Sequence, residues 1–77
     1  MEKISSYSYI NINKILYNKK VHFVSDCEFF PNFDINVFVY DIHLKNDEIL
    51  FETKNISNGK KLTIGSNMKN LQFELIN

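Results

Sequence analysis

Apolar residues recur at every second position over most of the chain, which is the spacing of a β-strand with one buried side and one solvent-facing side. In the segment Val21–Phe29, the odd-numbered residues are apolar or small and the even-numbered ones are mostly polar. The same alternation predicts further strands over 5–12, 14–17, 35–44, 48–57 and 71–76, and one that follows Asn58-Gly59. The pattern therefore predicts an all-β protein of short strands.

Turn-forming residues separate these segments. Pro31 presets the φ angle of a turn over Phe30–Asp34, and Lys45-Asn46-Asp47 predicts another reversal. Asn58-Gly59 is the strongest hairpin signal, because a two-residue type I′ turn needs positive φ at both central positions. Counting outward from that turn predicts the pairs Ser57 with Lys60, Asn55 with Leu62, Thr53 with Ile64, and Phe51 with Ser66.

The predicted strand 35–44 is apolar on both faces. Ile35, Val37 and Val39 share one face. The opposite face carries Phe38, Tyr40, Ile42 and Leu44. We expect a central strand that is covered on both sides for much of its length.

The fold expected from these features is a small antiparallel β-sandwich. Alanine, the strongest helix former, is absent, and no helical pattern of useful length is evident. About seven short strands joined by tight turns are typical of an immunoglobulin-like or fibronectin-III-like sandwich, and a small β-barrel is the alternative. With 77 residues, 44% of them hydrophobic, the chain provides one such domain over 1–77.

Charge and composition narrow the classes of partner. Nine basic residues, all lysine, balance nine acidic ones, so the formal net charge is +0. Nucleic-acid-binding chains normally carry a basic stripe, so we expect no nucleic-acid partner. No stretch approaches the ~20 apolar residues of a membrane span, so we expect a soluble protein without membrane contact, cytoplasmic if the chain is complete. The abundance of Lys, Asn and Ile indicates an AT-rich genome of a bacterium or its phage.

The chain offers little catalytic chemistry. Cys27 is the single cysteine, and His22 lies on the opposite face of the same predicted strand, so a Cys-His nucleophile is not expected. Asp41 and His43 share a face, as two metal ligands on a strand do, but the sequence indicates no third ligand. We predict that the protein is not an enzyme and has no catalytic residues, no metal and no cofactor.

The candidate binding residues are aromatic. Tyr7 and Tyr9 share one face of the first predicted strand, where their rings form a platform for a sugar ring or a partner protein. Phe30 and Phe33 lie in or beside the Pro31 turn, where a large apolar side chain is less easily explained as core. The alternatives are that the tyrosines complete the core and that the phenylalanines cap one end of the sandwich.

Three functions are compatible with these features. The first is a non-catalytic β-sandwich accessory or binding module, of the kind associated with bacterial carbohydrate-active or surface-polysaccharide enzymes, with a glycan or a protein as partner. The second is a small phage-type inhibitor that blocks a bacterial enzyme through a protein interface. The third is a homo-oligomeric structural protein that pairs edge strands between copies.

Overall fold

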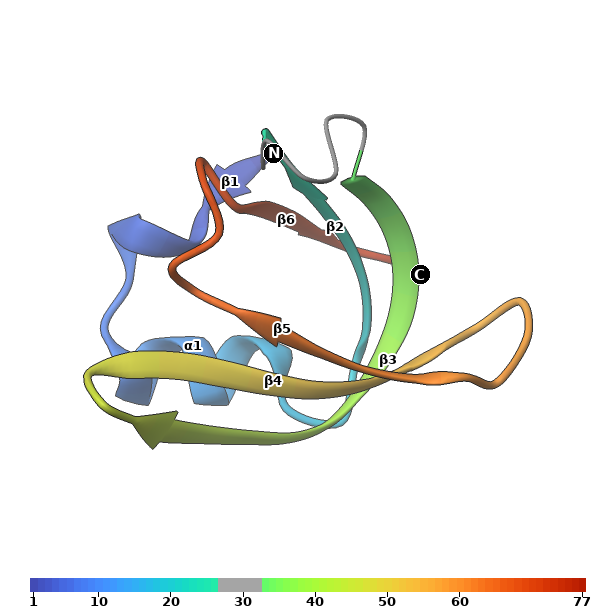
Figure 1. Cartoon of the computed structure of the whole chain (residues 1–77), viewed down its shortest axis with the longest axis horizontal. Helices are drawn as coiled ribbons and strands as arrows, with labels where there is room; N and C mark the ends of the chain where they lie inside the picture. The colour runs from blue at the N-terminus through green and yellow to red at the C-terminus, as the bar shows by residue number, and fades with distance from the viewer. Residues whose placement is uncertain (27–32) are drawn as a thin grey trace.

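Residues 1–26 and 33–77 are described by the structure, which is a computed structural model (Figure 1). Two helices lie near the N-terminus, the 3-10 helix η1 (Ile4–Ser6) and the α-helix α1 (Tyr9–Leu16). The strands are β1 (Glu2–Lys3), β2 (Lys20–Ser25), β3 (Phe33–Lys45), β4 (Glu48–Asn55), β5 (Lys61–Gly65) and β6 (Gln72–Leu75).

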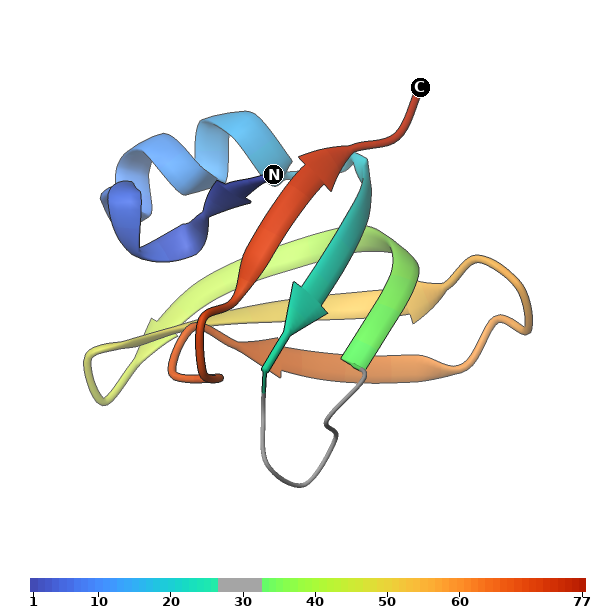
Figure 2. The same ribbon diagram turned by 90° about the horizontal axis from the view of Figure 1, so that it is seen from above.

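The predicted all-β class is confirmed, with one α-helix added to it. All six strands of the described ranges pair in one open antiparallel sheet, in the order β1-β6-β2-β3-β4-β5. Figures 1 and 2 show this sheet curling around its own interior. The two-sheet arrangement of a sandwich is not seen in this part of the chain, because the long strand β3 bends and carries the sheet around the core.

The prediction of two strands over 5–12 and 14–17 is wrong. This segment forms η1, a short extended link and α1. Ser8 caps the helix, since its side-chain oxygen accepts a hydrogen bond from the backbone N–H of Asn11 at 3.3 Å. Ile12 and Leu16 are four residues apart and therefore share one helix face, and both are fully buried. Packing against the sheet overrides the weak helix propensity of this sequence.

The faces predicted for β3 are correct up to Val39 and wrong beyond it. A β-bulge between Val39 and Asp41 shifts the register against β4. The extra residue moves Ile42 onto the face of Val37 and Val39, where it is 4% exposed. Phe38 and Tyr40 remain on the opposite face, which is not covered by a second layer in the described structure. The predicted covering of β3 on both sides is therefore wrong.

The β4–β5 hairpin forms where it was predicted, with a longer loop. The observed partners are Thr53 with Leu62 and Phe51 with Ile64, two positions from the predicted register. The backbone N–H of Asn55 bonds to the carbonyl of Lys60 at 2.8 Å, which leaves 56–59 as the loop. Only Gly59 of this loop has positive φ, at 72°, so the two-residue type I′ turn does not form. A shift by two preserves the predicted faces.

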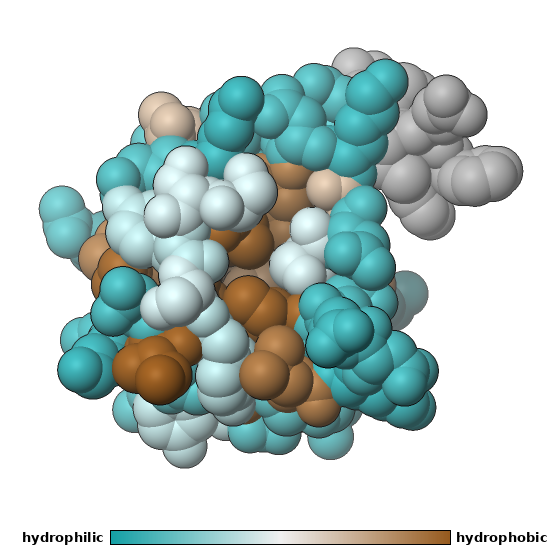
Figure 3. Space-filling model, turned by 90° about the vertical axis from the view of Figure 1, so that its left-hand side faces the viewer, coloured by the Kyte–Doolittle hydropathy of each residue, from teal (hydrophilic) through white to brown (hydrophobic). Residues whose placement is uncertain are grey.

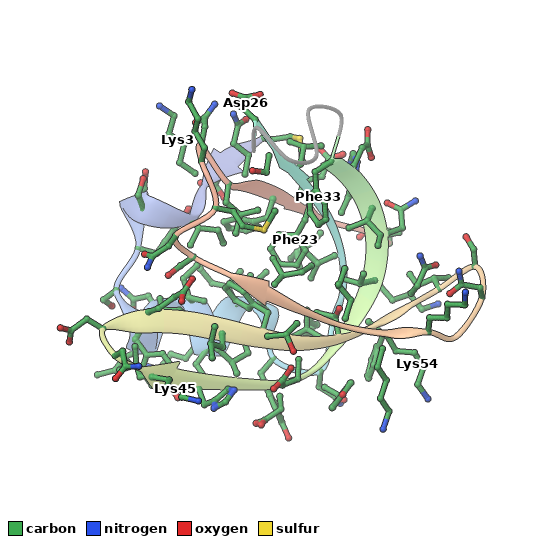
Figure 4. All side chains as sticks on the ribbon, viewed as in Figure 1. Lys3, Phe23, Asp26, Phe33, Lys45 and Lys54 are labelled. Atoms are coloured by element: carbon green, nitrogen blue, oxygen red, sulfur yellow. The ribbon has the colours of Figure 1, made fainter. Side chains whose placement is uncertain are left out.

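One face of the sheet, here called the inner face, encloses the hydrophobic core together with α1. Phe23 and Phe51 meet across this core with ring centroids 5.3 Å apart, and Figure 4 shows Phe23 pointing into the interior. The side-chain hydroxyl of Tyr9 donates a hydrogen bond to the carbonyl of Ile42 at 3.1 Å, which ties α1 to β3. The buried core residues are Ile4, Ile12, Leu16, Val21, Phe23, Val37, Val39, Ile42, Phe51, Ile64, Leu71 and Phe73.

Neither helix in the described ranges is long and apolar enough to cross a lipid bilayer. The predictions for Cys27 and Phe29, and for the centre of the turn at Pro31, concern positions outside the described residues.

Candidate functional site

The opposite face of the sheet, here called the outer face, carries an open pocket of about 220 Å³. Its lining consists of Phe38 and Tyr40 from β3, Lys54 from β4 and Lys61 from β5. We call it the lysine-aromatic pocket. Tyr40 is 37% exposed, a large fraction for an aromatic ring at the middle of a long strand.

Strand register brings these four side chains together. Phe38 lies directly opposite Lys54, and Lys54 lies directly opposite Lys61. Directly opposed residues of antiparallel strands point to the same face, so the three side chains form a row across β3, β4 and β5. Tyr40 joins the row at the bulge, the kind of irregularity that redirects a side chain.

The pocket has an unbalanced positive charge. Two ammonium groups extend from positions that face each other, an arrangement that destabilises an antiparallel pair of strands. Among the described residues, no carboxylate lies within ion-pair distance of Lys54 or Lys61. The Nζ atom of Lys61 is 5.9 Å from the centroid of the Tyr40 ring, within the range of a cation–π interaction.

The positive charge continues along the hairpin tip. Residues 54–61 include three lysines and no acidic residue. Figures 1 and 2 show that this hairpin projects from the body of the molecule, and in Figure 4 the side chain of Lys54 points away from the interior. The pocket is thus open to an approaching partner.

Glu52, the nearest acidic residue on β4, is engaged elsewhere. Its carboxylate accepts a hydrogen bond from the hydroxyl of Thr63. Its Oε2 atom lies 3.3 Å from the buried Nε2 atom of His43, an ion-pair distance without the geometry of a hydrogen bond. Glu52 therefore interacts with its own neighbours and not with the lysine pair.

A second polar cluster on the outer face joins three strands. The Nε2 atom of His22 lies 2.5 Å from a carboxylate oxygen of Asp34, and its Nδ1 atom lies 3.3 Å from Glu74. The hydrogen bond to Asp34 has the largest effect and raises the pKa of His22. Burial opposes this rise to a smaller extent, and the hydrogen bond to Glu74 adds a further increase. Two carboxylates on the two ring nitrogens favour the doubly protonated imidazolium, because each nitrogen then donates. The cluster links β2 to β3 and β6.

The lysine-aromatic pocket offers two ammonium donors and two aromatic faces, which suit an anionic group with an apolar body. Within the described ranges, no group of three or more His, Cys, Asp or Glu side chains has the geometry to hold a metal ion.

The structure separates the four aromatic residues predicted from the sequence. Tyr7 follows η1 and packs edge-on against Phe73 at 5.8 Å, while its hydroxyl donates to the carboxylate of Glu2. Tyr9 begins α1 and is half-buried. They share no strand face, because the strand predicted to carry them is absent.

Phe33 is the first residue of β3 and packs against the core from a half-buried position. Phe30 lies outside the described residues.

The sequence reasoning missed the lysine-aromatic pocket. The available signals were Phe38 and Tyr40, whose rings alternate with buried valines, and the lysines on either side of Asn58-Gly59. The alternation predicts that Phe38 and Tyr40 belong to a second buried face. The meeting of these aromatic residues with Lys54 and Lys61 depends on the pairing of three strands, which the alternation does not reveal.

Figure 3 shows, on the side of the molecule away from the hairpin, apolar side chains in a central hollow, surrounded by polar ones. This apolar area lacks the concentrated charge that distinguishes the lysine-aromatic pocket, so it specifies no ligand chemistry.

Comparison of the chain with protein-family models, with curated proteins and with solved structures finds no match.

Proposed function

We propose that this protein is a non-catalytic binding module that recognises an acidic segment of a protein partner through the lysine-aromatic pocket. The observation that supports this proposal is the directly opposed pair Lys54 and Lys61, which has no carboxylate partner among the described residues. An anion bound between the two ammonium groups would relieve their repulsion. Phe38 and Tyr40 line the same pocket beside the two ammonium groups.

A protein partner fits the shape of the site better than a small ligand does. The pocket is shallow, and the charge extends along the projecting hairpin over residues 54–61. Sites for small ligands bury most of the ligand surface in a deep cleft, whereas an open charged surface steers a macromolecular partner and fixes its orientation. This proposal is compatible with an accessory module of a larger bacterial enzyme and with an inhibitor, which differ in the partner and not in the recognition surface.

We also propose that the fold is a small, partly open β-barrel, which is the alternative to the sandwich. Its support is the single curled sheet with α1 packed against its interior. In such a barrel the outer face of β3, β4 and β5 remains free for a partner.

The test is a titration of the isotope-labelled protein with poly-glutamate, monitored by backbone amide chemical shifts. We expect the largest shifts at residues of the β4–β5 hairpin. Lys54→Gln and Lys61→Gln should each weaken binding about two- to fivefold, the range for one exposed charge pair. Lys45→Gln is the matched control, since Lys45 is an exposed lysine at the far end of β3.

The controls distinguish the competing ligands. A poly-uronate of similar charge density that binds more tightly than poly-glutamate would favour a glycan ligand. Equal weakening by Lys45→Gln, or shifts spread over the whole surface, would show that binding is non-specific and would overturn the proposed site.

A further inference from the structure

Strand β5 has an open edge next to the lysine-aromatic pocket. It is the last strand of the sheet order and pairs only with β4 in the described structure. An edge strand presents unpaired N–H and C=O groups, which can pair with another extended chain. The other end of the sheet is β1, which has 2 residues and offers far less length for pairing.

The hydrogen-bond register shows which backbone groups face outward. The carbonyl of Lys60 and the N–H of Ser66 bond to Asn55 and Ile49, at the two ends of the β4–β5 pair. In an antiparallel pair the residues that bond to the neighbour alternate with those that point away from it. Residues 60, 62, 64 and 66 therefore bond toward β4, and the backbone groups of Lys61 and Thr63 point away from the sheet.

The side chains of β5 provide two different surfaces along this edge. Lys61 and Thr63 lie opposite Lys54 and Glu52 and so belong to the outer face. Leu62 lies opposite the buried Thr53 on the inner face, yet it is 38% exposed because no described strand pairs with the far edge of β5. A strand added here would have one side next to a lysine and the other side next to an uncovered leucine.

We propose that the acidic segment binds as an additional antiparallel or parallel strand on the open edge of β5. This inference rests on the proposed function and adds to it the mode of recognition. The backbone of the segment pairs with Lys61 and Thr63, and its acidic side chains lie on the outer face beside the ammonium of Lys61. Neighbouring strands place facing side chains within about 4.5–5.5 Å of one another, close enough for ion pairing.

The sheet geometry also specifies the pattern of the bound segment. Side chains of a strand alternate between its two faces, so the residues between the acidic ones point to the inner face and cover Leu62. The partner segment is therefore expected to alternate acidic and apolar residues over the length of β5.

Charge favours this occupant over a second copy of the chain. If the β5 edges of two copies paired, the outer faces of the two sheets would become continuous and would carry two lysine pairs. The pocket contains no carboxylate that could neutralise either pair. Lysine on an edge strand is a known protection against such self-pairing. An acidic segment brings the opposite charge to Lys61 and is not opposed in this way.

The first experiment compares two substitutions of one residue. Thr63→Pro removes the outward-pointing N–H of the edge but no hydrogen bond to β4, and proline is tolerated at such edge positions. Thr63→Val keeps this N–H and, like Thr63→Pro, loses the hydroxyl that bonds to Glu52. The probe is a short blocked peptide that alternates glutamate with valine, and its affinity is measured by calorimetry. We expect Thr63→Val to bind within about twofold of the native protein and Thr63→Pro to lose about tenfold, since one backbone hydrogen bond is lost.

The second experiment moves the change to the peptide, so that the result does not depend on the folding of Thr63→Pro. N-methylation of the amides on one edge of the extended peptide should abolish binding, and methylation of the alternate amides should leave it within about twofold of the unmodified peptide. Equal effects of the two methylation patterns, or native-like binding by folded Thr63→Pro, would overturn strand addition.

The two proposals fail in different ways. If strand addition fails but Lys54→Gln and Lys61→Gln still weaken peptide binding, the lysine-aromatic pocket remains the site and only the mode of recognition is wrong. If neither lysine matters, the proposed function fails as well. If light scattering shows a dimer of the native protein that Thr63→Pro converts to a monomer, the occupant of the edge is a second copy, which overturns the acidic segment.

Discussion

Reversing the charge of Lys54 should stabilise the unbound protein while weakening its binding to an acidic partner. Lys54 faces Lys61 across the β4–β5 pair, so Lys54→Glu replaces a repulsive pair with an attractive one. A cross-strand charge pair contributes roughly 0.2–1 kcal/mol, and like charges cost a similar amount. Because both side chains are exposed, solvent screening limits the net gain in the free energy of unfolding to about 1 kcal/mol. For a domain of this size, that gain raises Tm by about 4–8 °C.

The assay is thermal unfolding followed by far-UV circular dichroism at low salt and at about 1 M salt. At about 1 M the Debye length falls to about 3 Å, so the gain in Tm should shrink markedly. Lys54→Gln should give about half of the gain, because it removes the repulsion without adding an attraction. Lys45→Glu is the control of opposite sign, since Lys45 faces Glu48 and the substitution places two acidic residues opposite each other.

A decrease in Tm for Lys54→Glu at low salt would refute this reasoning. So would a gain that is independent of salt, because it would arise from packing or strand propensity and not from charge. If stability rises as expected but binding to the acidic peptide is unchanged, the lysine pair has no part in recognition.

Substitutions at three other positions test the fold. Tyr9→Phe removes the hydrogen bond to the carbonyl of Ile42 and should cost about 1 kcal/mol in urea denaturation, without changing peptide affinity. Gly59→Ala places a side chain at φ +72° in open space, so strain alone should cost about 1 kcal/mol, and Gly59→Asn should cost less; equal costs would contradict the backbone explanation. The pKa of His22 is raised in the folded protein. Its contribution to stability is therefore complete at pH values below its pKa in the unfolded chain, about 6.5, and is lost as the pH rises through its pKa in the folded protein. The stability difference between the native protein and His22→Gln, measured from about pH 6 to 9, should therefore decrease with rising pH, and a constant difference would exclude protonation of His22 as its source.

The strand alternation by itself determined most of the sheet. It predicted β2, β3, β4 and β6 within a few residues at their described ends, because a half-buried strand requires apolar residues at every second position. It also predicted the buried face of Val21 and Phe23 correctly. The hairpin at Asn58-Gly59 was located correctly because turn chemistry is local.

The tertiary structure decided what local chemistry left open. The spacing of Ile12 and Leu16 is compatible with one face of a helix, and each residue is also compatible with a strand. The helix is selected by the tertiary structure, because α1 covers the partly enclosed interior of the sheet. The bulge after Val39 is likewise a compromise, since it lets β3 present apolar residues to the core on both sides of its bend.

The candidate site is also a feature that only the tertiary structure decides. Phe38, Tyr40, Lys54 and Lys61 are separated along the chain and meet only through the register of three strands. A sequence pattern reports which face of its own strand a residue occupies. It does not report which residue of another strand lies opposite, because that depends on the pairing of the whole sheet.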